Sequence, residues 1–258
     1  MTSLQQIDGR RIACWVNHGG FHPGRKTLVF IHGSGGDHTN WLRQYTALKD
    51  AFNMAAVDLP GHGRSEGPGE RAVAAYVEWM KKILDGLGIS KPVLIGHSLG
   101  AAIGLGFAIR YGEAVAAVVP VGGGLKMPVN PMLLEGLTRD PAAVIDLIAT
   151  FSIARQNREK FSRLIEESLS RVDPELLHGD FSACSALDIT DAAATVRIPV
   201  LAICGAQDKM TPPALSQSIC DRIPGARLVL IENAGHFVMM ENPEAFNAAL
   251  ADFVHART

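Results

Sequence analysis

Short runs of apolar residues without alternation recur along the chain and predict buried β-strands. They cover residues 27–31, 54–57, 93–95, 115–119, 199–204 and 227–231. Continuous apolar runs of this length are typical of parallel strands that are covered on both faces. Ahead of them, Asp8-Gly9 separates a short polar strand from residues 11–16, and this dipeptide favours a tight hairpin turn. The pattern therefore predicts a parallel sheet that opens with an antiparallel pair at its edge.

Helical periodicity separates most of these strands. Between residues 71 and 87, apolar residues recur at i, i+3 and i+4 spacing, which predicts an amphipathic helix that packs on the sheet. Further helices are expected at 40–50, 214–223 and 243–254. The run 58–65 contains three glycine or proline breaks and predicts a tight turn rather than catalytic groups. Strands that alternate with helices in this way indicate an α/β fold.

The alternation stops between about residue 125 and residue 191, where the pattern is helical throughout. Pro141 and Pro174 each open a helical segment, and a third segment lies between them at 161–172. A helical block that interrupts an α/β series is expected to fold on top of the sheet as a cap. We therefore predict a core of residues 1–123 and 192–258 and a helical cap insertion of residues 124–191.

Composition and charge exclude several classes of partner. The 258 residues are 47% hydrophobic and 19% charged, with a net charge of −2. This balance gives no electrostatic reason to bind nucleic acid or an anionic membrane. The N-terminus has no secretory signal pattern and no apolar run approaches the length of a membrane span, so a cytoplasmic protein is expected. Four scattered cysteines without CxxC spacing are interpreted as reduced core thiols.

The segment Gly96-His97-Ser98-Leu99-Gly100 carries the clearest chemical signal. It lies between the strand at 93–95 and a segment, 101–109, that is apolar on all sides and predicts a central helix. A serine in such a sharp turn is held in strained backbone, which requires small residues two before it and two after it. The segment has the G-x-S-x-G pattern of a nucleophile elbow, with the Leu99 N–H at the N-terminus of the new helix, where an oxyanion is stabilised.

A glycine-rich loop, residues 32–37, follows the strand at 27–31. Its spacing fits neither the Walker motif nor G-x-G-x-x-G, so a phosphate-binding loop is not favoured. Glycines allow close approach of a backbone N–H to the elbow, and either Ser34 or Gly35 is in place to donate it to an oxyanion. His32 is interpreted as a structural residue that braces this loop, and His97 is expected to point away from Ser98.

Asp208 and His236 both lie just past the carboxyl ends of predicted parallel strands. In open α/β sheets, ligands and catalytic groups gather at that edge. A serine hydroxyl needs an imidazole to take its proton and a carboxylate to fix the imidazole. The chain order Ser98, Asp208, His236 is the order expected for such a triad on this fold. Weaker alternatives for the carboxylate are Asp188 and Asp191.

Five motifs together resemble the α/β-hydrolase superfamily. They are HGSGGDHTNW (32–41), DLPGHGRS (58–65), GHSLG (96–100), GAQDKMTPP (205–213) and NAGHFVMMENPE (233–244). Within the superfamily they are similar to the branch of capped esterases, C–C bond hydrolases and cofactor-free haloperoxidases. The resemblance implies a mostly parallel, eight-stranded sheet with helices on both faces and an inserted cap. It also implies a triad of Ser98, Asp208 and His236, oxyanion donors at Ser34 and Leu99, and neither a cofactor nor a metal.

The favoured activity is hydrolysis of carboxylic esters of a small-molecule substrate through an acyl-enzyme. The same machinery leaves open C–C bond hydrolysis, thioester hydrolysis and perhydrolysis, and a ligand-binding receptor with a vestigial triad is a further alternative. Apolar residues of the predicted cap, together with Phe237, are expected to line an enclosed pocket for short to medium acyl chains. The cap residues are Leu125, Met127, Leu137, Val144 and Ile148.

Overall fold

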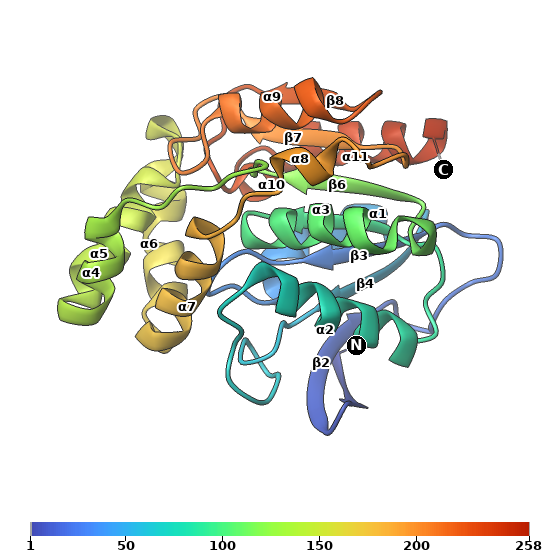
Figure 1. Cartoon of the computed structure of the whole chain (residues 1–258), viewed down its shortest axis with the longest axis horizontal. Coiled ribbons are helices and arrows are strands. Elements are labelled where there is room, and N and C mark those ends of the chain that lie inside the picture. The colour runs from blue at the N-terminus through green and yellow to red at the C-terminus, as the bar shows by residue number, and fades with distance from the viewer. Residues whose placement is uncertain (1, 258) are drawn as a thin grey trace.

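Eight strands form one sheet in the order β1-β2-β4-β3-β5-β6-β7-β8 in the computed structural model, which describes residues 2–257 (Figure 1). The strands are β1 Thr2–Ile7, β2 Arg10–Val16, β3 Thr27–Ile31, β4 Asn53–Val57, β5 Val93–His97, β6 Ala117–Val121, β7 Leu201–Gly205 and β8 Arg227–Ile231. The pairs β1–β2 and β2–β4 are antiparallel, and the remaining neighbours are parallel. The predicted mostly parallel sheet and its opening hairpin are confirmed.

Helices cover both faces of this sheet. They are α1 Leu42–Leu48, α2 Val73–Gly86, α3 Leu99–Tyr111, α9 Pro213–Arg222 and α11 Pro243–Arg257. Alternate side chains of the inner strands enter separate cores: on β3, Val29 and Ile31 belong to the core that includes side chains of α2, α3 and α9, whereas Leu28 and Phe30 belong to the core that includes side chains of α1 and α11. Burial on both faces is the reason that β3 to β7 carry apolar runs.

Between β6 and β7 the chain leaves the sheet and forms a group of helices. They are α4 Pro131–Arg139, α5 Pro141–Phe151, α6 Arg158–Leu169, α7 Pro174–Ser185 and α8 Thr190–Ala193. Figure 1 shows α4 to α7 together at one end of the sheet, on the left of the view. The helices predicted to open at Pro141 and Pro174, and the one between them, are confirmed, and α4 and α8 are additional.

Shorter elements complete the chain and account for one shifted boundary. They are the 3-10 helices His38–Trp41, Gly112–Ala114 and Arg155–Asn157, and the short helix α10 Val238–Glu241. β6 begins at Ala117 and not at Val115 as predicted. The 3-10 turn that follows α3 ends with Val115 as its cap, so the strand can pair with β5 only after it.

The four cysteines are free thiols, as expected. Cys14, Cys184 and Cys204 are buried free thiols, and Cys220 is a half-buried one. Burial raises the pKa of both Cys14 and Cys204 to about 12, so these thiols are poor nucleophiles. Across residues 2–257, no helix combines the length and the apolar character needed to cross a membrane.

Candidate active site

Ser98 lies between the end of β5 and the start of α3, with φ of 53° and ψ of −113°. A residue with a side chain adopts this left-handed backbone only under strain. A Cβ atom at Gly96 would lie 1.9 Å from the Gly100 carbonyl oxygen, and one at Gly100 would lie 2.4 Å from the Ile31 carbonyl oxygen. Only glycine fits at both positions, so this pair of glycines is what permits the sharp turn at Ser98.

The loop after β3 passes directly beside Ser98. A Cβ atom at Gly33 would lie 3.0 Å from the Ser98 Cβ atom, so the loop backbone touches the turn. The next residue, Ser34, lines the same cavity as Ser98. Leu99 is the first residue of α3, where a backbone N–H has no partner within the helix. The two residues expected to supply oxyanion donors thus lie on backbone segments next to Ser98.

His32 braces this loop, as expected. Its Nε2 atom accepts the Leu59 N–H at 3.0 Å, and its Nδ1 atom lies 2.7 Å from the Gly33 carbonyl oxygen. With Nε2 acting as an acceptor, Nδ1 carries the proton and donates it to that carbonyl. Burial, with the nearby His62 ring, lowers the pKa of His32 to about 4, so the ring is neutral near pH 7.

Asp208 and His236 meet past the ends of β7 and β8. The Asp208 Oδ2 atom lies 2.8 Å from the His236 Nδ1 atom, and the two residues are 4% and 5% exposed. The backbone N–H groups of Met210 and Thr211 each donate to Asp208 Oδ1 at 2.9 Å. These donors hold the carboxylate as an acceptor, so we assign the ring proton to Nδ1, which leaves Nε2 free to accept one.

Thr211, which was not predicted as a site residue, belongs to the same group of contacts. Its Oγ1 atom lies 2.8 Å from the Gly122 carbonyl oxygen, 2.9 Å from Asp208 Oδ2 and 3.0 Å from His236 Nδ1. This hydroxyl ties the carboxylate–imidazole pair to the loop after β6. Its place three residues after Asp208, in the same turn, is the only sequence signal that could have indicated it.

His97, which is expected to point away from Ser98, lines the cavity beside His236. The two ring centroids are 4.5 Å apart, and the His97 Nε2 atom lies 3.0 Å from the His236 carbonyl oxygen. Burial, with the neighbouring His236 ring, lowers the pKa of His97 well below its usual value. A neutral ring that donates to a backbone carbonyl supports the His236 loop and is not placed to act as a base.

One cavity of about 270 Å³ contains both Ser98 and His236 in its wall. Of the residues expected to line a pocket, Met127, Ile148 and Phe237 do so. Further apolar lining residues, which were not predicted, include Val129, Leu133, Leu169, Leu177, Phe181 and Met210. Polar side chains in the wall include Asn40, Asn130 and Lys209. A small, mostly apolar cavity with a few polar groups is typical of a small-molecule site.

Leu125, Leu137 and Val144 do not line this cavity, which differs from the expectation. Leu125 is 2% exposed and packs in the core beneath α2 and α3. Leu137 and Val144 belong to the other core, where a Cβ atom at Gly136 would lie 2.5 Å from the Val144 side chain. Leu137 and Val144 lie where α4 packs against α5, and helical periodicity cannot distinguish such packing from contact with a ligand.

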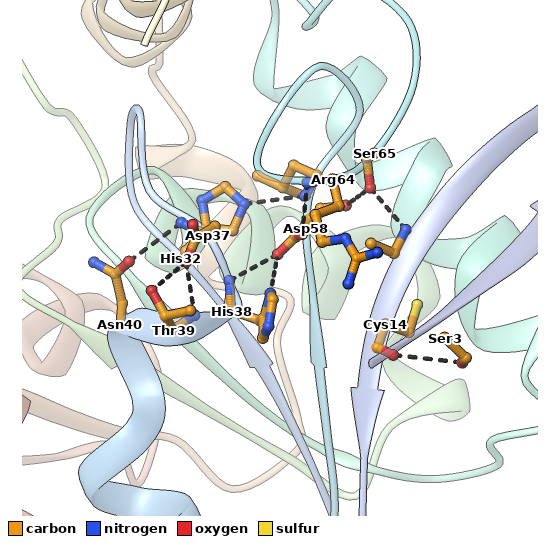
Figure 2. A network of polar contacts seen from close by, with 12 residues as sticks. Ser3, Cys14, His32, Asp37, His38, Thr39, Asn40, Asp58, Arg64 and Ser65 are labelled. Atoms are coloured by element: carbon orange, nitrogen blue, oxygen red, sulfur yellow. Dashed lines mark hydrogen bonds and ion pairs between the residues drawn. The ribbon is translucent and has the colours of Figure 1, made fainter. Parts of the chain in front are cut away.

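A separate polar network, centred on Asp58, joins the ends of β3 and β4 (Figure 2). Asp58 Oδ1 accepts the His38 N–H at 2.7 Å and lies 2.8 Å from His38 Nδ1, and Oδ2 accepts the Arg64 N–H at 2.9 Å. Asp37, His38 and Asp58 have ligand atoms within 4.8 Å of one another, as in a metal site. Both carboxylate oxygens of Asp58 and the Nδ1 atom of His38 are already engaged in hydrogen bonds. The cluster is therefore interpreted as a turn stabilised by its own polar groups.

Known proteins of similar sequence and structure match most of the chain. A model of the alpha/beta hydrolase family matches residues 28–249. The 2-hydroxy-6-oxononadienedioate/2-hydroxy-6-oxononatrienedioate hydrolase of Paraburkholderia phymatum is 29% identical over 265 residues, which cover 93% of this chain and 90% of that protein. A solved structure of a thermophilic esterase is 30% identical with a TM-score of 0.83, covering 99% and 97% of the two chains. The enol-lactonase from Burkholderia xenovorans LB400 has a TM-score of 0.90 at 22% identity, covering 98% and 100%, which is a likeness of fold alone.

Proposed function

Because this chain belongs to the alpha/beta hydrolase family, we propose that it is a serine hydrolase that cleaves carboxylic esters of short to medium acyl chain through an acyl-enzyme intermediate. The observation that carries the proposal is the backbone at Ser98, strained between two positions that only glycine can occupy. The same cavity contains His236, whose ring is bound by Asp208. Serine in such a turn, close to an oriented imidazole, is set up for nucleophilic attack.

In the proposed first step, Ser98 Oγ attacks the ester carbonyl carbon while His236 Nε2 takes the hydroxyl proton. Asp208 holds the Nδ1–H side of the ring and stabilises the imidazolium that forms. The carbonyl oxygen becomes an oxyanion, which accepts hydrogen bonds from the N–H groups of Leu99 and Ser34. Collapse of this tetrahedral state breaks the bond to the alcohol oxygen, and His236 gives its proton to that leaving group.

The second step uses the same residues on a water molecule. His236 Nε2 takes a proton from the water as its oxygen attacks the acyl carbon, and the same donors stabilise the second oxyanion. Collapse releases the carboxylic acid and returns the proton to Ser98. No group beyond the three triad side chains and the two backbone donors is needed for this cycle.

We propose that residues 124–191 act as a cap that shapes the acyl pocket. Met127 and Ile148 from this segment, together with Phe237, supply part of an apolar wall around a cavity of about 270 Å³. This volume lies just below the range of ligand pockets, which begins at about 300 Å³. It supports a substrate with a short or medium acyl group.

Hydrolysis of a 2-hydroxy-6-oxo acid is a second candidate. This compound class is in the name of the Paraburkholderia phymatum relative, which matches most of this chain. The same serine, imidazole and oxyanion donors could serve that reaction, a thioester or a perhydrolysis, because each passes through attack at or next to a carbonyl group. A comparison of ester, thioester and vinylogous diketone substrates separates these activities.

A substrate panel with Ser98→Ala as its control tests the proposal. We expect the wild-type enzyme to hydrolyse p-nitrophenyl butyrate and a fluorophosphonate to label Ser98. Ser98→Ala should lose roughly a millionfold in kcat, as a serine knock-out does in another triad enzyme, and keep the wild-type melting temperature. Near wild-type turnover by purified Ser98→Ala would refute the nucleophile. Faster turnover of the diketone than of any ester would favour the second candidate.

A further inference from the structure

A fully buried carboxylate, Asp180, projects from α7 toward the sheet. Its Oδ2 atom accepts the Gly35 N–H at 3.0 Å and lies 2.8 Å from His62 Nε2. Its Oδ1 atom accepts the Tyr76 hydroxyl at 2.8 Å. One side chain of the inserted helices thus bonds the loop after β3, the loop after β4 and helix α2.

Both carboxylate oxygens of Asp180 have hydrogen-bond partners within this cluster. A buried carboxylate is stable only when it is paired and hydrogen-bonded. Burial alone would lower the pKa of the buried His62, but the Asp180 carboxylate outweighs burial and raises that pKa above its usual value. Removal of the carboxylate would leave the Gly35 N–H and the His62 ring without this acceptor. Asp180 is therefore held in place from several sides and can in turn hold its neighbours.

Gly35 directly follows Ser34, the residue proposed to supply the second oxyanion donor. One face of α7, formed by Leu177, Asp180 and Cys184, lies against this loop. A Cβ atom at Gly35 would lie 3.0 Å from the Leu177 Cδ1 atom, and Ser34, Leu177 and Cys184 line the same cavity. The loop is packed against α7 at Gly35 and is hydrogen-bonded to it there.

Asp180 is absent from the wall of the cavity that contains Ser98, so it is not placed to contact the substrate. We propose that Asp180 is a positioning residue: its hydrogen bond to the Gly35 N–H fixes the peptide after Ser34 and so places the Ser34 N–H for the oxyanion. This inference rests on the proposed serine hydrolase function. It makes the inserted helices a structural part of the oxyanion hole and not only a wall of the pocket.

Three variants test this role. Asp180→Ala removes the acceptor for the Gly35 N–H, and Asp180→Asn keeps one oxygen acceptor without the charge. Tyr76→Phe is the matched control, because it removes a bond to the other carboxylate oxygen and leaves the Gly35 contact in place. The readouts are the second-order rate at which a fluorophosphonate labels Ser98, kcat and KM for p-nitrophenyl butyrate, the affinity for a trifluoromethyl ketone that forms a tetrahedral adduct, and Tm.

Displacement of an oxyanion donor reduces the stabilisation of the tetrahedral state more than that of the bound substrate. We therefore expect Asp180→Ala to lower the labelling rate and kcat by roughly tenfold to a hundredfold, with KM changed by less than about threefold. Affinity for the ketone should fall by the same factor as kcat/KM. Asp180→Asn should lose about threefold to tenfold in labelling rate. Tyr76→Phe should lower Tm but label within about threefold of wild type.

Two results would overturn the inference: a folded Asp180→Ala protein that labels at the wild-type rate, or a loss of kcat without loss of ketone affinity. If Asp180→Ala does not fold, Asp180→Asn decides, and a loss in labelling rate smaller than about threefold overturns the inference. The wild-type protein tests the proposed function separately. Failure of wild-type Ser98 to label refutes the nucleophile, whereas equal labelling of wild type and Asp180→Ala refutes only the positioning role.

Discussion

At the scale of single residues, the hydroxyl of Thr211 joins Asp208, His236 and the loop after β6. A hydroxyl has one proton, so it donates either to the Gly122 carbonyl or to Asp208 Oδ2 while staying 3.0 Å from His236 Nδ1. Thr211→Val keeps the shape and removes this restraint on the pair. We expect kcat to fall about tenfold with KM little changed, as loss of a hydrogen bond worth about 1.4 kcal/mol would give. Steady-state kinetics measure kcat and KM of the variant. Thr211→Ser, which keeps the hydroxyl, is the control and should retain wild-type kcat. An unchanged kcat in Thr211→Val would contradict the prediction.

Gly100 makes a second residue-scale prediction, which concerns stability. Its replacement by alanine would bring a methyl group to 2.4 Å from the Ile31 carbonyl oxygen. The clash is with backbone atoms, which cannot move away without distorting β3 or the turn at Ser98. We expect Gly100→Ala to lower the free energy of unfolding by at least about 1–3 kcal/mol, measured by thermal or urea denaturation. Gly104→Ala in the same helix is the control, because its nearest contact would be a Val118 methyl group at 3.2 Å. Equal stability of the two variants would show that the turn tolerates a side chain.

The sequence could single out Ser98, Asp208 and His236 because their chemistry demands particular residue types at the carboxyl ends of strands. The structure places Asp208 and His236 in direct hydrogen bond and Ser98 in the same cavity. Thr211 could not be found in this way, since a threonine in a turn has no pattern that marks it as a partner of His236. The role of Asp180 could not be predicted either. Its hydrogen bond to Gly35 joins residues 145 positions apart, and a sequence does not show which distant residues are in contact.

At the scale of elements, the His38–Asp58 pair joins the turns that follow β3 and β4. The hydrogen bond to Asp58 raises the pKa of His38 above 6.5. Burial alone would raise the pKa of Asp58, but hydrogen bonds from His38 and the Arg64 N–H lower it below 3.8. The histidine contribution to stability is complete below pH 6.5 and is lost as pH rises through the folded-state pKa. The aspartate contribution is present above pH 3.8 and is lost as pH falls through its folded-state pKa, so the pair stabilises most between these values.

This linkage predicts a pH-dependent effect of His38→Asn. The asparagine amide can reach Asp58 near the position of Nδ1, but it cannot be protonated. We expect the Tm of wild type to exceed that of His38→Asn by most at about pH 5–6, and the difference to shrink as pH rises above that range. Replacement of His18, which is exposed, by asparagine is the control and should leave Tm unchanged at each pH. A Tm difference for His38→Asn that does not vary with pH would contradict the linkage.

The elements themselves were largely predictable where burial imposes a pattern. β3 begins and ends where its apolar run does, because an unbroken run marks a strand between two layers of helices. The bounds of β8 also match its run, although this strand lies at the edge of the sheet and is only partly buried. α4 lies in the stretch predicted to be helical, but no separate helix was predicted at these residues. Its apolar face is short: Leu137 is its one buried residue, and Leu133 and Leu134 are half-buried. The signals that could have marked its start are the Asn130 cap and Pro131 as the first helical residue.

At the scale of the whole molecule, the inserted helices are anchored to the loop that carries His236. The His236 N–H donates to the Ser152 carbonyl oxygen at 2.7 Å. Glu241 accepts the Ala154 N–H and the Gly235 N–H, each at 2.9 Å, through its two carboxylate oxygens. Together with the Asp180 bond to Gly35, these contacts hold the insertion on both sides of the cavity. The pocket walls are therefore fixed in position around Ser98.

A pocket with fixed walls predicts selectivity for acyl length. We expect p-nitrophenyl butyrate to be hydrolysed faster than palmitate, with no rise in rate above the critical micelle concentration, since a cavity of about 270 Å³ has no broad apolar face to open. A series of p-nitrophenyl esters from acetate to palmitate measures this. Phe181→Ala, which removes a ring from the wall, should shift the optimum to longer chains. Palmitate as the best substrate of the wild type, or activation at an oil–water interface, would contradict the prediction.

The position of the insertion also has a consequence for folding kinetics. β6 and β7 are neighbours in the sheet, yet β6 ends at Val121 and β7 begins only at Leu201. Their ladder is short, with Val121 paired to Ile203 and an isolated bridge between Val118 and Val200. Closing a long loop lowers the chain entropy before the contacts between β6 and β7 form and offset this loss. The junction between β6 and β7 is therefore expected to form late during refolding.

Ser98 lies on one side of that late junction, and Asp208 and His236 lie on the other. After dilution from denaturant, the segment from β1 to β6 should regain its helices and strands first, and β7 and β8 should dock onto it afterwards. Enzyme activity should accordingly return more slowly than the far-ultraviolet circular dichroism signal in a stopped-flow refolding experiment. Simultaneous recovery of both signals would mean that the two parts of the sheet close in a single step.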